Sequence, residues 1–139
     1  MPENAKIYVA KTVESGKMKD HESEEMYLET ILVLKGERPA VRSIDIAEKL
    51  GYAKSSVSRG VSLLQDRGYI KVGDDGFIDF TEKGQKKANG IYERHNTLTK
   101  FFINIGASEE LAESNACRIE HVIDEQIFEL IKKHVSNTH

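Results

Sequence analysis

Apolar residues recur with helical spacing over most of this chain, so that side chains three and four positions apart share a face. Residues 22–34 follow this spacing, with apolar side chains at positions 26–28 and 31–34, and predict a largely buried helix. Residues 43–68 contain two shorter amphipathic segments, which are separated by Gly51 and the sequence YAK. Two short helices joined by a glycine-containing turn predict a helix-turn-helix.

Over residues 69–80, apolar and polar residues alternate on either side of a glycine-containing turn instead of following helical spacing. The sequence YIKV can pair with FIDF across GDDG, whose Asp-Gly step favours a tight turn. This pattern predicts a β-hairpin directly after the helix-turn-helix. A helix, a helix-turn-helix and a hairpin in this order predict a winged helix.

The rest of the chain returns to helical spacing. Thr81 is a good N-cap for a long helix that ends at Gly106, and Ser108 opens a further helix that continues through the sequence NACRIEHVID. The last segment, residues 124–135, has one apolar stripe. These helices have too little mass for a full core of their own, so we expect a homodimer that shares their apolar faces. The candidate interface residues are Phe101, Phe102, Ile127 and Leu130.

These elements define a mainly α fold, with an N-terminal winged helix-turn-helix followed by an all-helical dimerisation domain. We place the winged-helix domain at residues 22–89 and the helical domain at residues 90–139. Residues 1–21 show no sustained periodicity, and we interpret them as a flexible arm.

The composition is that of a soluble globular protein, with 39% hydrophobic and 31% charged residues. No apolar run approaches the roughly 18 residues that a membrane span needs, and the polar N-terminus has no signal-peptide pattern. A single cysteine excludes an intrachain disulfide, which fits a reducing compartment. We therefore expect a cytoplasmic protein without a membrane partner.

The charge is unevenly distributed along the chain. The net charge is −3, but residues 38–71 hold seven lysine and arginine residues against three acidic residues, a local charge of +4. Together with the winged helix, this basic region predicts binding to double-stranded operator DNA. Hydroxyl groups and arginine suit phosphates and base edges, although each such residue taken alone is better explained as a helix cap or a solvated surface. The candidate DNA-binding residues are Arg42, Lys54, Ser55, Ser56, Ser58, Arg59, Lys71 and Lys83.

The only cysteine, Cys117, lies three and four positions before Glu120 and His121. On a helix these offsets bring a thiol, a carboxylate and an imidazole together over one turn. Such a set could ligate a metal ion, or it could be a buried cysteine beside two solvated polar groups.

The sequence EEMYLETILVL, followed by the winged helix and then by ACRIEHVID, resembles the diphtheria-toxin-repressor and manganese-transport-regulator family. The resemblance covers about residues 22–135. It implies a metal-activated, homodimeric bacterial transcriptional repressor, with metal bound between the first helix and the dimerisation helices. We expect no SH3-like third domain of the kind found in iron-type members, because the chain stops at His139.

The resemblance implies a first metal site made of Met26, Cys117, Glu120 and His121. Met26 and Cys117 stand at positions that are methionine and cysteine in iron-type members and aspartate and glutamate in manganese-type members. Glu120 and His121 match ligands that both types share.

The resemblance also implies a second metal site. His95 matches a histidine of both types, and Glu29 matches a carboxylate of the manganese type. Iron-type members have a carboxylate and a histidine where this chain has Thr99 and Glu113, and Glu113 is included as a candidate ligand. The first site therefore resembles the iron type, whereas the layout of the chain resembles the manganese type.

Ligand chemistry bears on the choice of metal. Thiolate and thioether ligands are soft and favour later ions, whereas manganese prefers carboxylate oxygen and imidazole. We therefore expect Fe²⁺ in preference to Mn²⁺, with Co²⁺, Ni²⁺ or Zn²⁺ as substitutes in vitro.

Two other functions are open at this point. Cys117 could be a redox sensor rather than a ligand, if its surroundings lowered the pKa of the thiol. A metal-using enzyme is the third hypothesis, but the sequence has no HExxH motif, no phosphate-binding loop and no nucleophile with its base.

Overall fold

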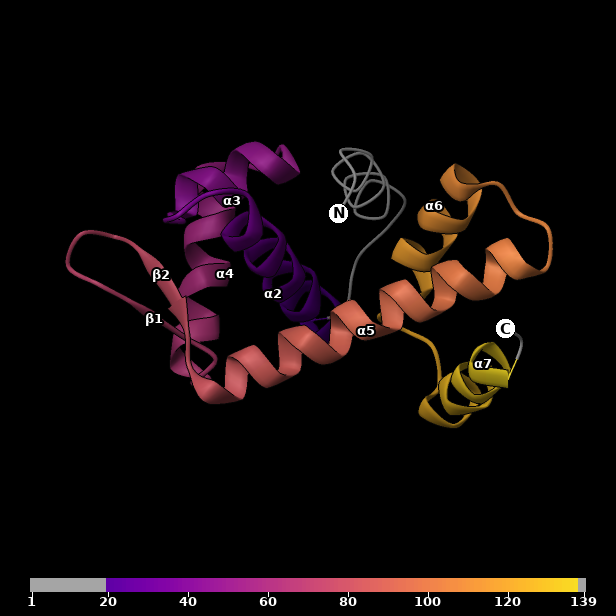
Figure 1. Cartoon of the computed structure of the whole chain (residues 1–139). Helices are drawn as coiled ribbons and strands as arrows, with labels where there is room; N and C mark the ends of the chain where they lie inside the picture. Colours follow the sequence, from indigo (N-terminus) through magenta and orange to yellow (C-terminus); the bar gives the residue numbers. More distant parts are fainter. Residues whose placement is uncertain (1–19, 138–139) are drawn as a thin grey trace.

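The computed structural model describes residues 20–137 of the chain (Figure 1). The winged helix comprises helices α2 (Asp20–Glu37), α3 (Ser43–Leu50) and α4 (Lys54–Asp66), followed by strands β1 (Ile70–Val72) and β2 (Ile78–Phe80). This order confirms the predicted helix, helix-turn-helix and hairpin. Residues 1–19 of the predicted arm lie outside the described residues.

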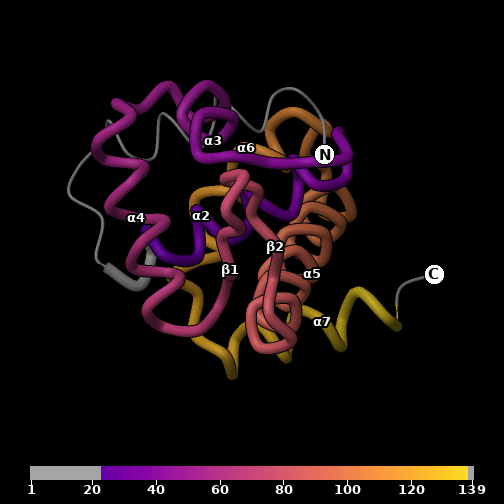
Figure 2. Tube along the Cα trace, turned by 90° about the vertical axis from the view of Figure 1, so that its left-hand side faces the viewer, coloured from indigo at the N-terminus to yellow at the C-terminus, as the bar shows by residue number. Residues whose placement is uncertain are grey.

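The C-terminal part comprises helices α5 (Glu82–Asn104), α6 (Glu109–Ile119) and α7 (Glu125–Asn137). The hydroxyls of Thr81 and Ser108 accept the backbone amide protons of Gly84 (3.1 Å) and Leu111 (3.2 Å), which confirms both predicted N-caps. α5 begins beneath the hairpin and ends between α6 and α7 (Figure 1), and it recedes behind the hairpin when the molecule is turned (Figure 2). The boundary predicted between residues 89 and 90 lies within this unbroken helix.

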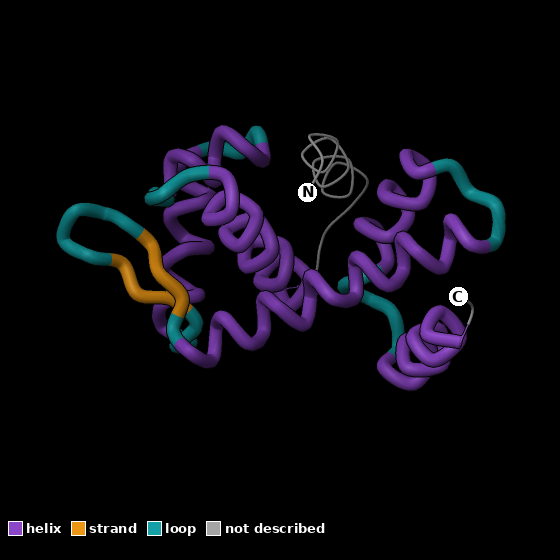
Figure 3. The backbone as a smooth tube through the Cα atoms, in the orientation of Figure 1, coloured by secondary structure: helices purple, strands orange, loops and turns teal. Residues whose placement is uncertain are grey.

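The predicted hairpin forms and projects from the rest of the winged helix, which is called the head below (α2 to β2, residues 20–80) (Figure 3). Ile70 lies opposite Phe80, and Val72 lies opposite Ile78. The backbone amide of Ile78 also donates to the carbonyl oxygen of Val41 (2.8 Å), which attaches the hairpin to the segment before α3. Ile70 and Ile78 are buried in the core, so side-chain packing and a backbone hydrogen bond both hold the wing to the head.

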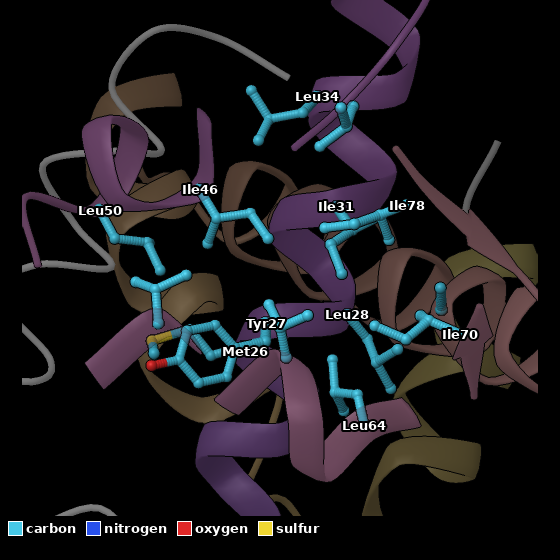
Figure 4. Packing of buried hydrophobic residues seen from close by; sticks show 14 of the residues in the cluster. Met26, Tyr27, Leu28, Ile31, Leu34, Ile46, Leu50, Leu64, Ile70 and Ile78 are labelled. Carbon is cyan, nitrogen blue, oxygen red and sulfur yellow. The ribbon is translucent and has the colours of Figure 1, made fainter. Parts of the chain in front are cut away.

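α2 is the central helix of the hydrophobic core. Its residues Leu28, Ile31 and Leu34 are at most 1% exposed and pack among side chains of α3, α4 and the hairpin (Figure 4). Ile91 of α5 and Cys117 of α6 belong to the same cluster of buried residues. The winged helix and the C-terminal helices therefore share one core around α2.

Several apolar side chains remain on the surface of the C-terminal helices. Ile127 and Leu130 of α7 are 50% and 64% exposed. Phe101 and Phe102 of α5 are half-buried, with their ring centroids 5.8 Å apart. No helix within residues 20–137 is both long and apolar enough to cross a membrane.

Two glycines in the first half of α5 have different surroundings. A Cβ atom at Gly84 would overlap the backbone carbonyl oxygen of Tyr69, because α5 packs directly against the segment before β1. A Cβ atom at Gly90 would meet no atom within 4 Å. Gly84 therefore allows the close contact between α5 and the hairpin, whereas Gly90 only lowers helix propensity.

We predict opposite effects for alanine at these two positions. Gly84→Ala should lower the free energy of unfolding by about 3 kcal/mol, because backbone atoms would have to move apart. Gly90→Ala should raise it by about 0.5–1 kcal/mol through helix propensity alone. Urea unfolding followed by circular dichroism measures both values, and a similar effect of the two substitutions would contradict the close packing at Gly84.

Candidate metal centre

The predicted helix that carries Cys117, Glu120 and His121 on one face is wrong in its length. α6 ends at Ile119, and His121 lies in the turn that leads to α7. Glu120 is the C-cap residue, and its backbone amide still donates to the carbonyl oxygen of Ala116 (3.0 Å). The sequence NACRIEHVID contains neither glycine nor proline, so no local signal marks the end of the helix.

The turn nevertheless places Glu120 and His121 close to potential metal ligands on the neighbouring helices. Ligand atoms of His95, Cys117 and Glu120 lie within 4.8 Å of one another, and all three residues are buried. His95 Nδ1 is 2.8 Å from Glu120 Oε2 and 3.7 Å from Cys117 Sγ. Glu113 Oε2 lies 3.2 Å from the other ring nitrogen of His95.

A second buried cluster contains Glu29, Glu120 and His121, again with ligand atoms within 4.8 Å of one another. His121 Nε2 is 3.2 Å from Glu120 Oε1 and 3.7 Å from Glu29 Oε1. Glu120 is therefore common to both clusters. The resemblance had grouped Cys117 with His121 and Glu29 with His95, whereas the structure pairs Cys117 with His95 and Glu29 with His121.

Met26 of α2 lies in the hydrophobic core, where it is 3% exposed (Figure 4). Its sulfur accepts a hydrogen bond from the Tyr52 hydroxyl at 3.4 Å. Met26 and Cys117 belong to the same cluster of buried residues. The methionine predicted as a ligand is therefore held within the core of the winged helix by a polar contact with Tyr52.

The pKa values of Glu29, Glu120 and His121 are shifted because these three titratable groups are buried close together. Burial raises the pKa of the Glu120 carboxyl, but hydrogen bonds to His121 and His95 outweigh burial and lower it to about 2. Burial lowers the pKa of His121, but hydrogen bonds to Glu120 and Glu25 outweigh that effect and raise it to about 9. Burial and the adjacent Glu120 charge raise the pKa of Glu29 well above its ordinary value. Without a bound cation, the pKa values of the two carboxyls are therefore shifted in opposite directions.

Cys117 has no feature of a reactive thiol. Its side chain is 3% exposed, and burial, followed by the charges of Glu120, Glu29 and Glu113, raises the pKa of the thiol. A redox-sensing cysteine needs an accessible thiolate. These surroundings therefore oppose the redox hypothesis and would allow a thiolate only beside a compensating cation.

Two oxygen atoms test whether a cation fits this centre. Glu29 Oε2 and Glu120 Oε1 are the buried side-chain nitrogen or oxygen atoms of the described residues that lack a well-formed hydrogen bond, and Glu120 Oε1 has an ion-pair contact with His121 Nε2 at 3.2 Å. Buried polar atoms are usually hydrogen-bonded, and carboxylate oxygens of this kind beside imidazole and thiol groups are suitable ligands for a divalent metal ion. The donor set therefore fits a divalent transition metal.

Sequence reasoning missed two residues next to the centre. Glu25 Oε1 lies 3.2 Å from His121 Nδ1. Arg94 of α5 donates to the carbonyl oxygen of Glu120 (3.3 Å). Helical spacing could have indicated the first of them, because Glu25 lies four positions before Glu29 on the same face of α2.

The predicted DNA-binding residues lie on or beside the winged helix. Lys54, Ser55, Ser58 and Arg59 are exposed on α4. Ser56 of the same helix is half-buried. The first turn of α4 therefore presents hydroxyl and basic groups to solvent.

The three other predicted DNA-binding residues differ in whether their side chains contact other parts of the protein. Lys71 is exposed on β1. Arg42 donates to the carbonyl oxygen of Asp75 (3.2 Å), and its guanidinium lies 4.3 Å from the ring centroid of Phe77. Lys83 donates to the carbonyl oxygen of Arg67 (3.0 Å). Arg42 and Lys83 thus both contact residues of the head.

Comparison with known proteins identifies the class. Residues 21–76 match the sequence profile described as the iron dependent repressor, N-terminal DNA binding domain. Residues 81–139 match the profile of the iron dependent repressor, metal binding and dimerisation domain. The chain belongs to the diphtheria-toxin-repressor and manganese-transport-regulator family, which consists of transcriptional repressors and not of enzymes.

Individual relatives include regulators named for different metals. The iron-dependent repressor IdeR of Mycobacterium tuberculosis is 32% identical over 114 residues, which are 81% of this chain and 50% of that protein. The regulator MntR of Lysinibacillus sphaericus is 33% identical over 99 residues, which are 71% of each chain. The solved structure of the manganese regulator SloR has a TM-score of 0.70 at 24% identity and covers 81% of this chain and 53% of that one. The chain thus spans about half the length of its mycobacterial relative.

We predict that the metal-free protein is destabilised by the Glu29 carboxyl. Glu29→Gln keeps the size of the side chain, removes a buried acid, and supplies an amide that can donate to Glu120 Oε1. The free energy of unfolding of chelator-treated protein should rise by about 1–3 kcal/mol. Urea unfolding measures it, and Glu110→Gln on the exposed face of α6 should change it by less than about 0.5 kcal/mol. An unchanged or lower stability of Glu29→Gln would show that the carboxyl is well accommodated.

Proposed function

We propose that this chain is a metal-dependent transcriptional repressor that binds operator DNA as a homodimer and controls genes of metal homeostasis. The observation that carries the proposal is the pair of buried His, Cys and Glu clusters that share Glu120. They lie in a chain whose N-terminal part matches a DNA-binding domain of known repressors. The membership of the family supports the same function.

The two clusters suggest how the residues divide between metal ions. One ion would be held by Glu29, Glu120 and His121, and a second by His95, Cys117 and Glu120. Glu113 and Met26 are further candidate ligands beside them. A bound ion would supply a ligand-bonding partner for the two carboxylate oxygens that lack a well-formed hydrogen bond.

Ferrous iron is the metal that we propose first, ahead of manganese. The thiol of Cys117 is the softest donor within the clusters, and Met26 would add a thioether. The carboxylates and imidazoles would also accept Mn²⁺, and relatives are named for both metals. Co²⁺, Ni²⁺ and Zn²⁺ are expected substitutes in vitro.

The ligands come from parts of the chain that would have to act together. Glu29 belongs to α2, the central helix of the winged-helix core, whereas His121 belongs to the turn after α6. An ion bound by both would fix the head relative to the C-terminal helices. Operator binding would then favour the metal-bound orientation, and by linkage operator DNA would tighten metal binding.

The proposed homodimer would set the distance between two heads. The exposed side chains of Ile127 and Leu130 on α7 are candidates for the interface, since large apolar groups in solvent favour association. Two copies of α4 could then enter successive major grooves of a palindromic operator. This arrangement rests on the family resemblance for its symmetry.

We predict that specific DNA binding requires the metal centre. In anaerobic fluorescence anisotropy, Fe²⁺ should increase the affinity of the wild-type protein for operator DNA. His121→Ala should lose this increase and keep weak nonspecific binding. His134→Ala, which removes the exposed histidine of α7, is the matched control and should keep the response. Metal-free protein that binds operator as tightly as Fe²⁺-saturated protein would refute the proposed function.

We predict that Arg59 contributes to sequence recognition. Arg59→Ala should weaken operator binding by about 1–3 kcal/mol if the guanidinium contacts a guanine. Lys54→Ala should instead lower affinity for all sequences and reduce the salt dependence. Arg118→Ala on the exposed surface of α6 is the control for loss of one positive charge. If Arg59→Ala and Arg118→Ala bind the operator equally well, α4 does not read DNA through Arg59.

A further inference from the structure

The ring of His121 lies between carboxylates on both of its edges. Nε2 faces Glu120 Oε1 at 3.2 Å and Glu29 Oε1 at 3.7 Å, both members of the proposed metal centre. Nδ1 faces Glu25 Oε1 at 3.2 Å. Glu25 is a member of neither ligand cluster, so the two nitrogens of the ring have different surroundings.

Glu25 is itself buried and close to a guanidinium. It is 6% exposed, and its Oε1 lies 3.9 Å from Arg94 Nη1. The same Arg94 nitrogen donates to the backbone carbonyl oxygen of Glu120 (3.3 Å), and Nη2 donates to Glu125 Oε2 (3.1 Å). Arg94 therefore connects Glu25 of α2 with the turn that carries Glu120 and His121, and with the first turn of α7.

A histidine that binds a metal through one nitrogen commonly donates its other N–H to a carboxylate. This hydrogen bond selects the tautomer, fixes the plane of the ring, and makes the ligating nitrogen more basic. The contact between Glu25 and Nδ1 has the chemistry that this role requires. The nitrogen left to ligate is Nε2, which is the one that faces Glu29 and Glu120.

We propose that Glu25 is a positioning residue of the metal centre, which accepts the Nδ1 proton of His121 and leaves Nε2 to bind the cation. Arg94 holds Glu25 and the turn in register. The inference rests on the proposed function, because it assigns a role toward the ion that the centre would bind. It adds a second connection between α2 and the turn, alongside Glu29, that does not pass through the ion.

Co²⁺ titration of the full chain under anaerobic conditions, in competition with a chelator of known affinity, tests the role of Glu25. Glu25→Ala should weaken Co²⁺ binding by about 10–100-fold, the usual loss when such a partner of a ligating histidine is removed. Glu25→Gln should lose less, because the amide oxygen can still accept the Nδ1 proton. If Glu25→Ala does not fold, as judged by circular dichroism, Glu25→Gln carries the test with an expected loss of a few fold.

Glu24→Gln is the matched control on the same helix. Glu24 is equally buried, but its carboxylate pairs with Arg67 (2.8 Å) and Lys87 (3.3 Å) and belongs to neither cluster. Its replacement should lower stability, because it breaks these two ion pairs. Co²⁺ affinity should stay within about twofold of the wild-type value, because Glu24, unlike Glu25, contacts no proposed metal ligand among the described residues. A loss of Co²⁺ affinity in Glu24→Gln as large as in Glu25→Ala would mean that general destabilisation explains both, and would overturn the proposal.

Nitrogen-15 NMR of the Zn²⁺-loaded protein gives a readout that stability alone would not change. The wild-type spectrum should show His121 protonated at Nδ1 and bound to zinc through Nε2. Zinc on Nδ1 would overturn the proposal, and so would wild-type Co²⁺ affinity in both Glu25 variants while His121→Ala loses binding. That pattern would leave the proposed function intact, whereas absence of Co²⁺ binding by the wild-type chain would overturn the function and this inference together.

Discussion

The burial of the Glu120 carboxylate is the constraint on which the arrangement of the C-terminal half depends. This side chain is completely shielded from solvent, and a buried charge without compensation costs several kcal/mol. His95 of α5 at 2.8 Å and His121 of the following turn at 3.2 Å provide that compensation. α6 ends beside Glu120, although no glycine or proline marks the end of the helix. The turn and the two helices beside it are held in place by one carboxylate.

Glu29 is the second buried carboxyl of this arrangement, and we expect it to lower the stability of the metal-free chain. Burial and the nearby Glu120 charge raise the pKa of the Glu29 carboxyl, and Glu29 Oε2 lacks a well-formed hydrogen bond. Residues that reduce stability without an evident structural benefit concentrate at functional sites. A divalent cation is the simplest group that would satisfy both carboxyls, and it would explain why the five titratable residues of the two clusters meet in the interior. An ion bound here would therefore be expected to raise the free energy of unfolding.

α2 connects this chemistry to the winged helix. One stretch of the helix carries Leu28, Ile31 and Leu34 into the core of the head, and the same helix presents Glu25 and Glu29 to the turn after α6. Metal binding at Glu29 would therefore act directly on α2, the helix around which α3, α4 and the hairpin pack. A two-state change in orientation needs such a rigid connection between the site and the responding part. Arg94 adds a fixed contact at the same boundary.

The sequence by itself determined the winged helix, because helical spacing, alternation and the Asp-Gly turn are local signals that the core then reinforced. It also supplied the donor types, since Cys117, Glu120, His121 and the resemblance around them pointed to metal before any fold was known. The end of α6 was not predictable, because NACRIEHVID contains no glycine or proline to mark it. The grouping of Cys117 with His95, the sharing of Glu120 and the contact of Glu25 with His121 were decided only by the tertiary structure. These pairs lie up to 96 positions apart, and no periodicity along the chain can carry information about which distant side chains face each other across a packed interior.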